Sequence, residues 1–283
     1  MKKALGLTLL CLFACGPAFG GGFSLKVTGG LGLVGGGNYN DIVDGQNQYY
    51  HSFPLVNVIE ELDQLRWGLN FGAEVIYHFS DRLGLGLGVG YLRASDESTM
   101  EARLFTSPLF VTYHPSVSSV PLTLSLHYFL PLSSGLNLHL FGGPGLYLTS
   151  VKLDRLASFP SELTQQADSF EPDGKAVLGF EGGLGLEVGL GRGVFLVADI
   201  KGRALTVSNL HGHLAESFDI GALHLSGQRN ATMWYVEEQV YGAYYASIEY
   251  DTLEPDEADM RNVEEASFGL SGFSFLVGIR VRL

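Results

Sequence analysis

The chain has 283 residues, of which 38 are glycine, and its 17 basic residues face 30 acidic ones, for a formal net charge of −13. A chain this acidic repels nucleic acid, so we expect no nucleic-acid partner. Its two cysteines, Cys11 and Cys15, both lie near the N-terminus. The rest of the sequence therefore excludes a disulfide framework, a catalytic cysteine and a cysteine-based metal site.

Residues 1–20 have the order of a secretory signal, because Lys2 and Lys3 precede an apolar run that ends in small residues. The apolar run is too short to cross a bilayer as a helix. Ala18 and Gly20 have the spacing that signal peptidase needs, which predicts cleavage after Gly20. The alternative is a lipoprotein signal with lipidation at Cys15. If cleavage follows Gly20, the mature domain is 21–283.

Beyond this leader no apolar run is long enough for a membrane helix, and apolar residues alternate with small or polar ones. In 83–92 one face holds leucine, valine and tyrosine, and the other holds four glycines and a leucine. This is the period of a strand. Solvent does not require glycine, whereas the crowded interior of a narrow barrel does. The same split predicts eight strands, at 23–34, 67–79, 83–92, 121–132, 136–149, 177–190, 194–204 and 268–283.

The connections between these strands alternate between short and long. Three-residue hairpin turns are predicted at 80–82, 133–135 and 191–193. The other connections are long loops at about 37–66, 96–119, 151–174 and 209–267. Outer-membrane barrels have short periplasmic turns and long extracellular loops. The sequence therefore predicts an all-β fold, an eight-stranded antiparallel up-and-down transmembrane β-barrel with both chain ends in the periplasm.

The turns also predict the register of the hairpins. Pairing Leu190 with Val194 places inward Glu181 opposite inward Arg203, one step from Lys201, and predicts that Glu181 and Arg203 form an ion pair. Pairing the residues that flank the first turn places three bulky inward side chains opposite three glycines: Glu74, Ile76 and His78 opposite Gly88, Gly86 and Gly84.

Together these segments resemble the OmpA/OmpX-like class of small eight-stranded outer-membrane barrels over residues 21–283. The resemblance rests on architecture rather than on a diagnostic motif. It implies a bacterial outer-membrane location, with membrane lipid, lipopolysaccharide and the barrel-assembly machinery as partners. The last strand is similar to the C-terminal signal that this machinery reads, which usually ends in Phe rather than Leu. Its residues are Phe273, Phe275, Val277, Ile279, Val281 and Leu283.

Inward charged and polar residues predict a polar network inside the barrel. Because eight strands leave room for little more than side chains, we expect the interior to be filled. Inward aromatic residues such as Phe129 and Phe141 favour this interpretation. The alternative is a narrow channel or a carrier of small hydrophobic solutes. The network residues are Lys26, Glu74, His78, Glu181, Glu187, Asp199, Lys201, Arg203, Arg280 and Arg282.

The last long loop is rich in aromatic residues, which predicts strands that protrude past the membrane and bind an extracellular partner. The alternative is a hairpin that packs only against the neighbouring loops. The residues concerned are Trp234, Tyr235, Tyr241, Tyr244 and Tyr245.

Histidine and serine in the loops leave one enzymatic alternative open. Some barrels of this size resemble lipid A-modifying enzymes, for which His51, Ser52, His211 and His213 are the candidates here. His211 and His213 share a strand face but lack a third metal ligand at a recognisable spacing. The acidic run 251–259 lacks the spacing of a calcium loop. We therefore expect no catalysis, no cofactor and no metal, and favour a structural or surface-interaction barrel.

Overall fold

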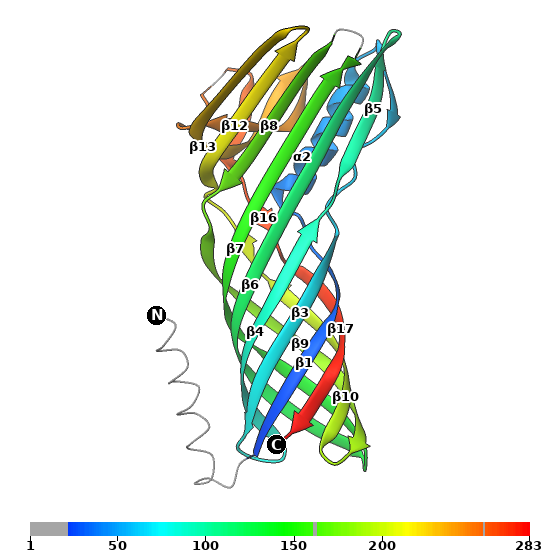
Figure 1. Cartoon of the computed structure of the whole chain (residues 1–283), viewed down its shortest axis with the longest axis vertical. Coiled ribbons are helices and arrows are strands. Elements are labelled where there is room, and N and C mark those ends of the chain that lie inside the picture. Colours follow the sequence, from blue (N-terminus) through cyan, green and yellow to red (C-terminus); the bar gives the residue numbers. More distant parts are fainter. Residues whose placement is uncertain (1–21, 161–162, 257) are drawn as a thin grey trace.

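The computed structural model describes residues 22–160, 163–256 and 258–283. The leader predicted at 1–20, with its cleavage site and the alternative lipidation at Cys15, lies outside these residues. Within them, no helix combines the length and the apolar character needed to cross a membrane. The described chain forms a barrel with a head on top of it (Figure 1).

The barrel consists of eight strands, each antiparallel to the next, and the last strand pairs with the first. This closed ring confirms the predicted antiparallel barrel of eight strands. In ring order the strands are β1 (Gly22–Leu33), β3 (Trp67–His78), β4 (Leu83–Ser95), β6 (Ser107–Ser133), β7 (Leu136–Phe159), β9 (Lys175–Gly191), β10 (Val194–Ala204) and β17 (Gly272–Arg282).

The barrel strands turn their large apolar side chains outward. Leu85, Leu87 and Val89 of β4 are 43%, 51% and 50% exposed, while the glycines between them point inward. Gly86 illustrates the reason, since a Cβ atom on it would collide with the side chains of Glu74, Ser125 and His127. The inward glycines therefore leave room for large side chains of neighbouring strands.

The register of two hairpins agrees with the sequence argument. Across the third turn, Glu181 of β9 lies opposite Arg203 of β10. Across the first turn, the three bulky residues of β3 lie opposite the three glycines of β4: Glu74, Ile76 and His78 opposite Gly88, Gly86 and Gly84.

One detail of the third turn differs from the prediction. Val194 pairs with Gly191 instead of Leu190, and a β-bulge after Val194 restores the predicted register. Gly191, Arg192 and Gly193 all have positive φ angles, of 102°, 50° and 78°. This left-handed turn takes up the extra residue without moving the inward side chains to the outer face.

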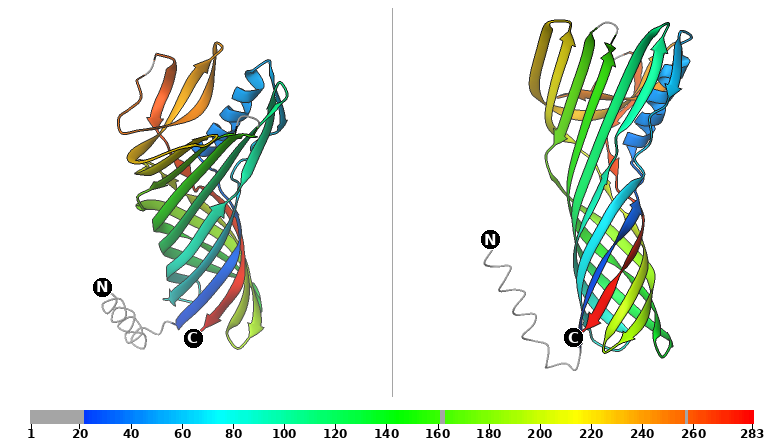
Figure 2. Two further views of the ribbon diagram at one scale, coloured as in Figure 1. Left: turned by 45° about the horizontal axis from the view of Figure 1, so that its top comes forward. Right: turned by 45° about the vertical axis from the view of Figure 1, so that its right-hand side comes forward.

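The segments predicted as long loops are mostly folded, so that part of the prediction is wrong. β6 and β7 continue beyond the ring and form the middle of a curved sheet in the head (Figures 1 and 2). The sequence predicts protruding strands only for the last loop. The remaining strands of the head are β2 (Val56–Glu60), β5 (Ser98–Leu104), β8 (Thr164–Pro172), β12 (His211–Ile220), β13 (Leu223–Val240), β14 (Ala243–Asp251) and β15 (Met260–Glu265).

The head also contains a helix that the sequence argument does not predict, α2 (Asn38–Ser52), which packs against β14. Its buried apolar residues are few, chiefly Tyr39, Ile42 and Val43. A polar side chain also joins the helix to the segment after β2. The side-chain amide of Asn47 donates a hydrogen bond to the carbonyl of Leu62 and accepts one from its backbone N–H. Side-chain hydrogen bonds to the backbone thus replace the apolar stripe that a surface helix ordinarily shows.

Three segments meet where the barrel passes into the head, and we call residues 34–37, 205–210 and 266–271 the stopper. Two short strands, β11 (Thr206–Val207) and β16 (Phe268–Gly269), pair within it, so the predicted strand 268–283 is interrupted before β17 begins at Gly272. The amide of Leu270 donates to the carbonyl of Leu205 over 3.0 Å. The stopper is packed with apolar side chains that are at most 5% exposed: Val34, Leu205, Val207, Leu210, Phe268 and Leu270.

Candidate functional site

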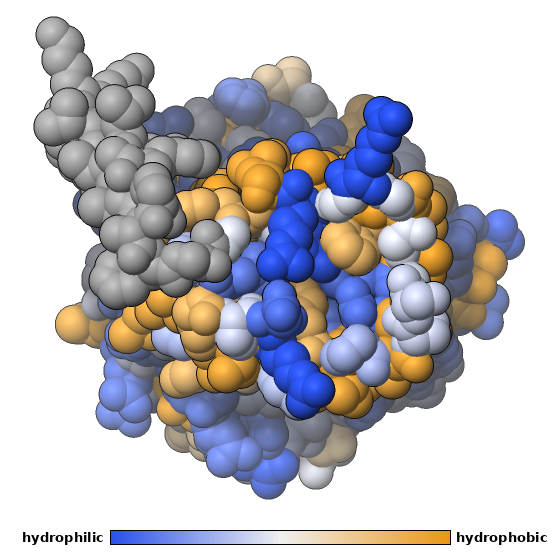
Figure 3. Space-filling view, turned by 90° about the horizontal axis from the view of Figure 1, so that it is seen from below, coloured by the Kyte–Doolittle hydropathy of each residue, from blue (hydrophilic) through white to orange (hydrophobic). Residues whose placement is uncertain are grey.

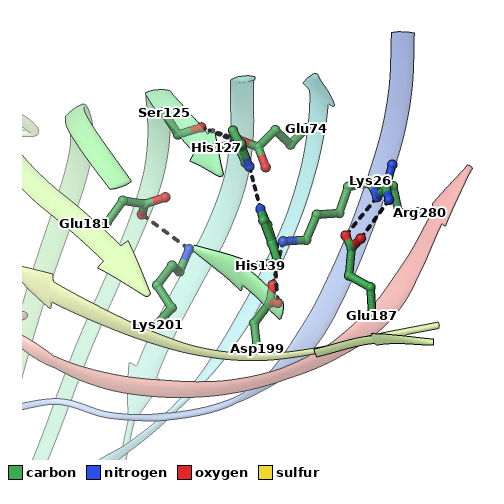
Figure 4. Close-up of polar contacts among 10 residues, drawn as sticks. All are labelled: Lys26, Glu74, Ser125, His127, His139, Glu181, Glu187, Asp199, Lys201 and Arg280. Atoms are coloured by element: carbon green, nitrogen blue, oxygen red, sulfur yellow. Dashed lines mark hydrogen bonds and ion pairs between the residues drawn. The ribbon is translucent and has the colours of Figure 1, made fainter. Parts of the chain in front are cut away.

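The interior of the barrel is filled by ion pairs that join its strands (Figure 4). Lys26 of β1 lies 2.6 Å from Asp199 of β10, and both side chains are at most 5% exposed. The guanidinium of Arg280 on β17 donates two hydrogen bonds to Glu187 on β9, of 2.8 and 2.7 Å. Paired in this way, the buried charges avoid the free-energy cost of isolated ones.

A third ion pair corrects the sequence prediction. Glu181 pairs with Lys201 over 3.2 Å, instead of with Arg203, although Arg203 lies opposite it in the register. The side chain of Arg203 is directed to the stopper, where its Nε donates to the carbonyl of Leu270 over 2.7 Å. Glu181 also accepts a hydrogen bond from the hydroxyl of Tyr147. Arg203 thus binds a backbone carbonyl of the stopper instead of the carboxylate opposite it.

A chain of side chains crosses the interior between β3 and β10, and two of its members are not among the predicted network residues. His127 of β6 contacts Glu74 over 2.9 Å, and its other ring nitrogen contacts His139 of β7 over 2.7 Å. The two imidazole rings are nearly parallel, with an angle of 9° between their planes and centroids 4.9 Å apart. Ser125 donates to Glu74 from the same side. Both histidines fall on the inward face of predicted strands, so the alternation alone could have identified them.

Aromatic rings complete the filling of the interior. His139 stacks between Phe129 and Phe141, at centroid distances of 4.7 and 5.1 Å. The guanidinium of Arg280 lies over the rings of Phe129 and Phe195, at 4.9 and 4.2 Å. These contacts exclude water and add cation–π attraction to the ion pairs.

At the turn end of the barrel the remaining two network residues differ in exposure. His78 is buried, and its Nε2 lies 2.8 Å from the hydroxyl of Ser24. Arg282 is exposed at the rim, 3.5 Å from Asp81 in the first turn, and so lies outside the buried network. Viewed from this end, hydrophilic residues fill the centre of a ring of hydrophobic ones (Figure 3).

Little open space remains inside the barrel. A cavity of about 50 Å³ lies among Lys26, Glu74, Phe141, Asp199 and Lys201. Because one water molecule needs roughly 10–15 Å³ of such space, the cavity has room for only a few water molecules. The stopper lies above this cavity, with the Leu205 side chain reaching inward Gly179. In the described structure the interior is therefore closed to all but the smallest solutes.

The aromatic residues predicted for partner binding lie on the β13–β14 hairpin of the head. Trp234 and Tyr235 are half-buried on β13, while Tyr241 at the turn is 76% exposed. Tyr244 lies beneath the guanidinium of Arg261, at 3.6 Å, and Tyr245 makes an edge contact with Tyr49 of α2. Most of this hairpin therefore packs within the head, and Tyr241 remains accessible.

The candidates for catalysis or metal binding lie on separate elements. His51 of α2 contacts Glu61, and the hydroxyl of Ser52 donates to the carbonyl of Tyr49. His211 and His213 lie on β12, where His211 contacts Thr232. Among the residues that the structure describes, no group of three histidine, cysteine or acidic side chains could hold a metal ion.

The residues of the predicted assembly signal lie on β17 and at the chain end that follows it. Val281 is half-buried. The other five point out of the barrel and are between 49% and 71% exposed: Phe273, Phe275, Val277, Ile279 and Leu283.

These features define a closed antiparallel β-barrel with an apolar outer surface and a filled, ion-paired interior. The chain matches the family model of the outer membrane protein beta-barrel domain over residues 6–218 and belongs to that family. It is therefore an outer-membrane β-barrel protein.

Several solved structures are similar to the chain, and two of them are named here. One is the outer membrane protein OprG from Pseudomonas aeruginosa, with 10% identity and a TM-score of 0.38, covering 93% of this chain and 96% of that one. The other is a major outer membrane protein from Thermus thermophilus, with 11% identity and a TM-score of 0.36, covering 93% and 99%. No curated protein matches the chain.

Proposed function

We propose that this protein is a non-catalytic surface protein in which a closed barrel anchors the head outside the cell. The filled interior carries the proposal, because a cavity of about 50 Å³ beneath an apolar stopper does not suit a channel or a solute carrier. The narrow channel considered from the sequence is thus disfavoured. The head, by contrast, is a large folded surface outside the barrel, so its contacts with a partner do not depend on open space in the barrel interior.

The outer surface of the barrel supports its orientation in the membrane. Barrel strands such as β10 and β17, with 11 residues each, suit the length of a transmembrane strand. The short turns and both ends of the barrel domain lie away from the head, which corresponds to the periplasmic side in this class of protein. In this orientation membrane lipid and lipopolysaccharide surround the ring, and the outward face of β17 is offered to the barrel-assembly machinery.

The distribution of charge supports an aqueous location for the head. Five acidic residues lie on the ring of barrel strands or in its turns: Glu74, Asp81, Glu181, Glu187 and Asp199. The other acidic residues that the structure describes lie in the head, including Asp154 where β7 extends beyond the ring. The head also exposes apolar residues at its tips, namely Phe105 and Tyr241, at 71% and 76%. Tyr241 lies at the turn of the β13–β14 hairpin, for which the sequence argument predicts contact with a partner.

The proposed orientation can be tested in intact cells by cysteine labelling. Tyr241→Cys places a thiol at the exposed tip of the head, and Asp81→Cys places one in the first turn, where the native side chain is 94% exposed. We expect a membrane-impermeant maleimide to label only Tyr241→Cys in intact cells and both variants after lysis. Labelling of Asp81→Cys alone in intact cells would reverse the orientation and refute a surface role for the head.

A further inference from the structure

One strand of the head has a free edge over half of its length. β13 pairs with β12 through Leu223–Thr232 and with β14 through Thr232–Val240. In the part of the chain that the structure describes, no second strand pairs with the stretch before Thr232. All eight residues from Leu223 to Asn230 are exposed. Figure 1 shows this stretch of β13 at the outer edge of the head.

A hydrogen bond at the end of this stretch shows which backbone groups are free. The N–H of Met233 donates to the carbonyl of Leu210, which continues the pairing of β12 with β13. Backbone groups of successive residues in a strand point to opposite sides, so odd-numbered residues here point toward β12 and even-numbered ones away from it. The free N–H and C=O groups therefore belong to His224, Ser226, Gln228 and Asn230.

This edge lacks the features that ordinarily protect a free strand, which are proline, lysine, a bulge or a short length. From Leu223 to Asn230 the sequence has neither proline nor lysine, and the pairing with β12 is regular. The one arginine, Arg229, is engaged with Glu216 and with the carbonyl of Tyr250. At the far end of the same sheet β2 has only five residues, and its pairing with β5 contains a bulge.

Apolar side chains lie beside the free edge on one face of the sheet. Leu223 and Leu225 are each 54% exposed. They lie opposite Ile220 and Phe218 of β12, which are exposed as well. Gly227 follows on the same face, and a Cβ atom there would have no contact within 4 Å. An added strand therefore finds apolar side chains to pack against and room for a large side chain over Gly227.

We propose that the free edge of β13 binds an extended segment of a partner polypeptide as an additional strand. The proposal rests on the proposed function, which places the head outside the cell. Backbone hydrogen bonds supply the attraction, and apolar side chains at alternate positions of the segment pack on Leu223 and Leu225. Because the chain has a formal net charge of −13, a neutral or basic segment suits this edge better than an acidic one.

Binding can be measured by fluorescence polarisation with the full chain in lipid nanodiscs and a labelled synthetic peptide. The peptide alternates valine with threonine over about ten residues, the upper length of an ordinary strand, and has a lysine at each end. A control peptide of the same sequence is methylated on every backbone nitrogen and has no N–H to donate. We expect saturable binding of the first peptide and none of the second, with empty nanodiscs as the background.

A pair of variants tests whether the peptide binds this edge. Ser226→Pro removes a free N–H and keeps the hydrogen bonds to β12, since proline is tolerated where the N–H faces away from the sheet. It should weaken binding about tenfold, the effect of one lost hydrogen bond and the group that it leaves unpaired. Ser226→Ala changes the same side chain but keeps the N–H, and should bind as the wild type does. Heat-modifiable gel mobility verifies that both variants fold.

Two results would overturn the proposal. The first is wild-type protein that binds neither peptide, or both equally, which requires no variant to fold. The second is a wild-type dimer that Ser226→Pro dissociates and the peptide leaves intact, which would assign the edge to a second copy of the chain. Neither result concerns the orientation of the head, which the cysteine labelling tests separately.

Discussion

Arg280 and Glu187 bind each other across the interior of the barrel, although β10 lies between their strands in the sheet. β17 pairs with β10 and β10 with β9, so the bidentate contact spans two strand spacings. The two side chains are 4% and 0% exposed. This pair therefore links parts of the ring that backbone hydrogen bonds do not connect directly.

Removing one partner of this pair should be costly. Glu187→Ala leaves Arg280 buried and unpaired, which destabilises a protein by about 3 to 5 kcal/mol. We expect a clear fall in the urea midpoint of the refolded barrel. The matched control is Val188→Ala, the next residue on β9, whose side chain faces outward and is 45% exposed. Equal losses in the two variants would contradict a structural role of the ion pair.

The second prediction concerns the glycines that point into the barrel. Gly86→Trp should block assembly, because even a Cβ atom at this position would collide with Glu74, Ser125 and His127. Gly88→Trp should do the same, since its Cβ would meet Thr123. Leu87→Trp faces outward and should assemble. Folding yield is measured by the mobility of unheated samples on gels, and equal yields for the three variants would refute the assignment of faces.

The partner of Glu181 can be identified by double-mutant cycles. Glu181 contacts Lys201 and Tyr147, whereas Arg203 is directed to the carbonyl of Leu270. We therefore expect a coupling energy of about 0.5 to 3 kcal/mol between Glu181→Ala and Lys201→Ala, as for residues in contact. The coupling between Glu181→Ala and Arg203→Ala should be smaller. If the coupling energy with Arg203→Ala were the larger of the two, the Glu181–Arg203 ion pair predicted from the register would be the correct one.

Buried tyrosines should make the head sensitive to alkali. Burial raises the pKa of Tyr50, on α2, from 10.0 to about 12. A raised pKa in the folded state means that the stability contributed by this phenol is complete below pH 10 and is lost as the pH rises toward 12. Phenolate absorbance should show a late titration step that Tyr50→Phe reduces. If wild type and Tyr50→Phe have identical titration curves while circular dichroism reports a folded head, the burial of Tyr50 is contradicted.

The barrel could be predicted from the sequence because its strands face two environments with opposite requirements. In residues 83–91 of β4 every second residue is a leucine, valine or tyrosine and the residues between them are glycine, so both the faces and the register could be derived. The head could not be predicted in this way. Asn40 and Asn47 of α2 bind backbone groups of Leu65 and Leu62, 25 and 15 residues away, and such contacts leave no periodic pattern in the sequence.

For the site, the sequence identifies which charges point inward but not how they pair. Lys201 and Arg203 lie on the same face of β10, Arg203 opposite Glu181 and Lys201 diagonal to it, so long side chains from both positions can reach it. The carbonyl of Leu270, in the stopper, binds Arg203, and Lys201 is therefore the residue that pairs with Glu181. Strand alternation places His127 and His139 on the inward face. Because neutral histidines carry no formal charge, a search for inward charges alone does not identify them.

The central claim, that the barrel is closed, is tested most directly by the conductance of the purified, refolded protein in planar lipid bilayers. We expect no discrete conductance steps from the wild type, because the three interior ion pairs and the stopper leave a cavity of only about 50 Å³. Heat-modifiable gel mobility of the same sample provides the control for folding. Stable, ion-conducting steps from correctly folded wild-type protein would contradict the claim.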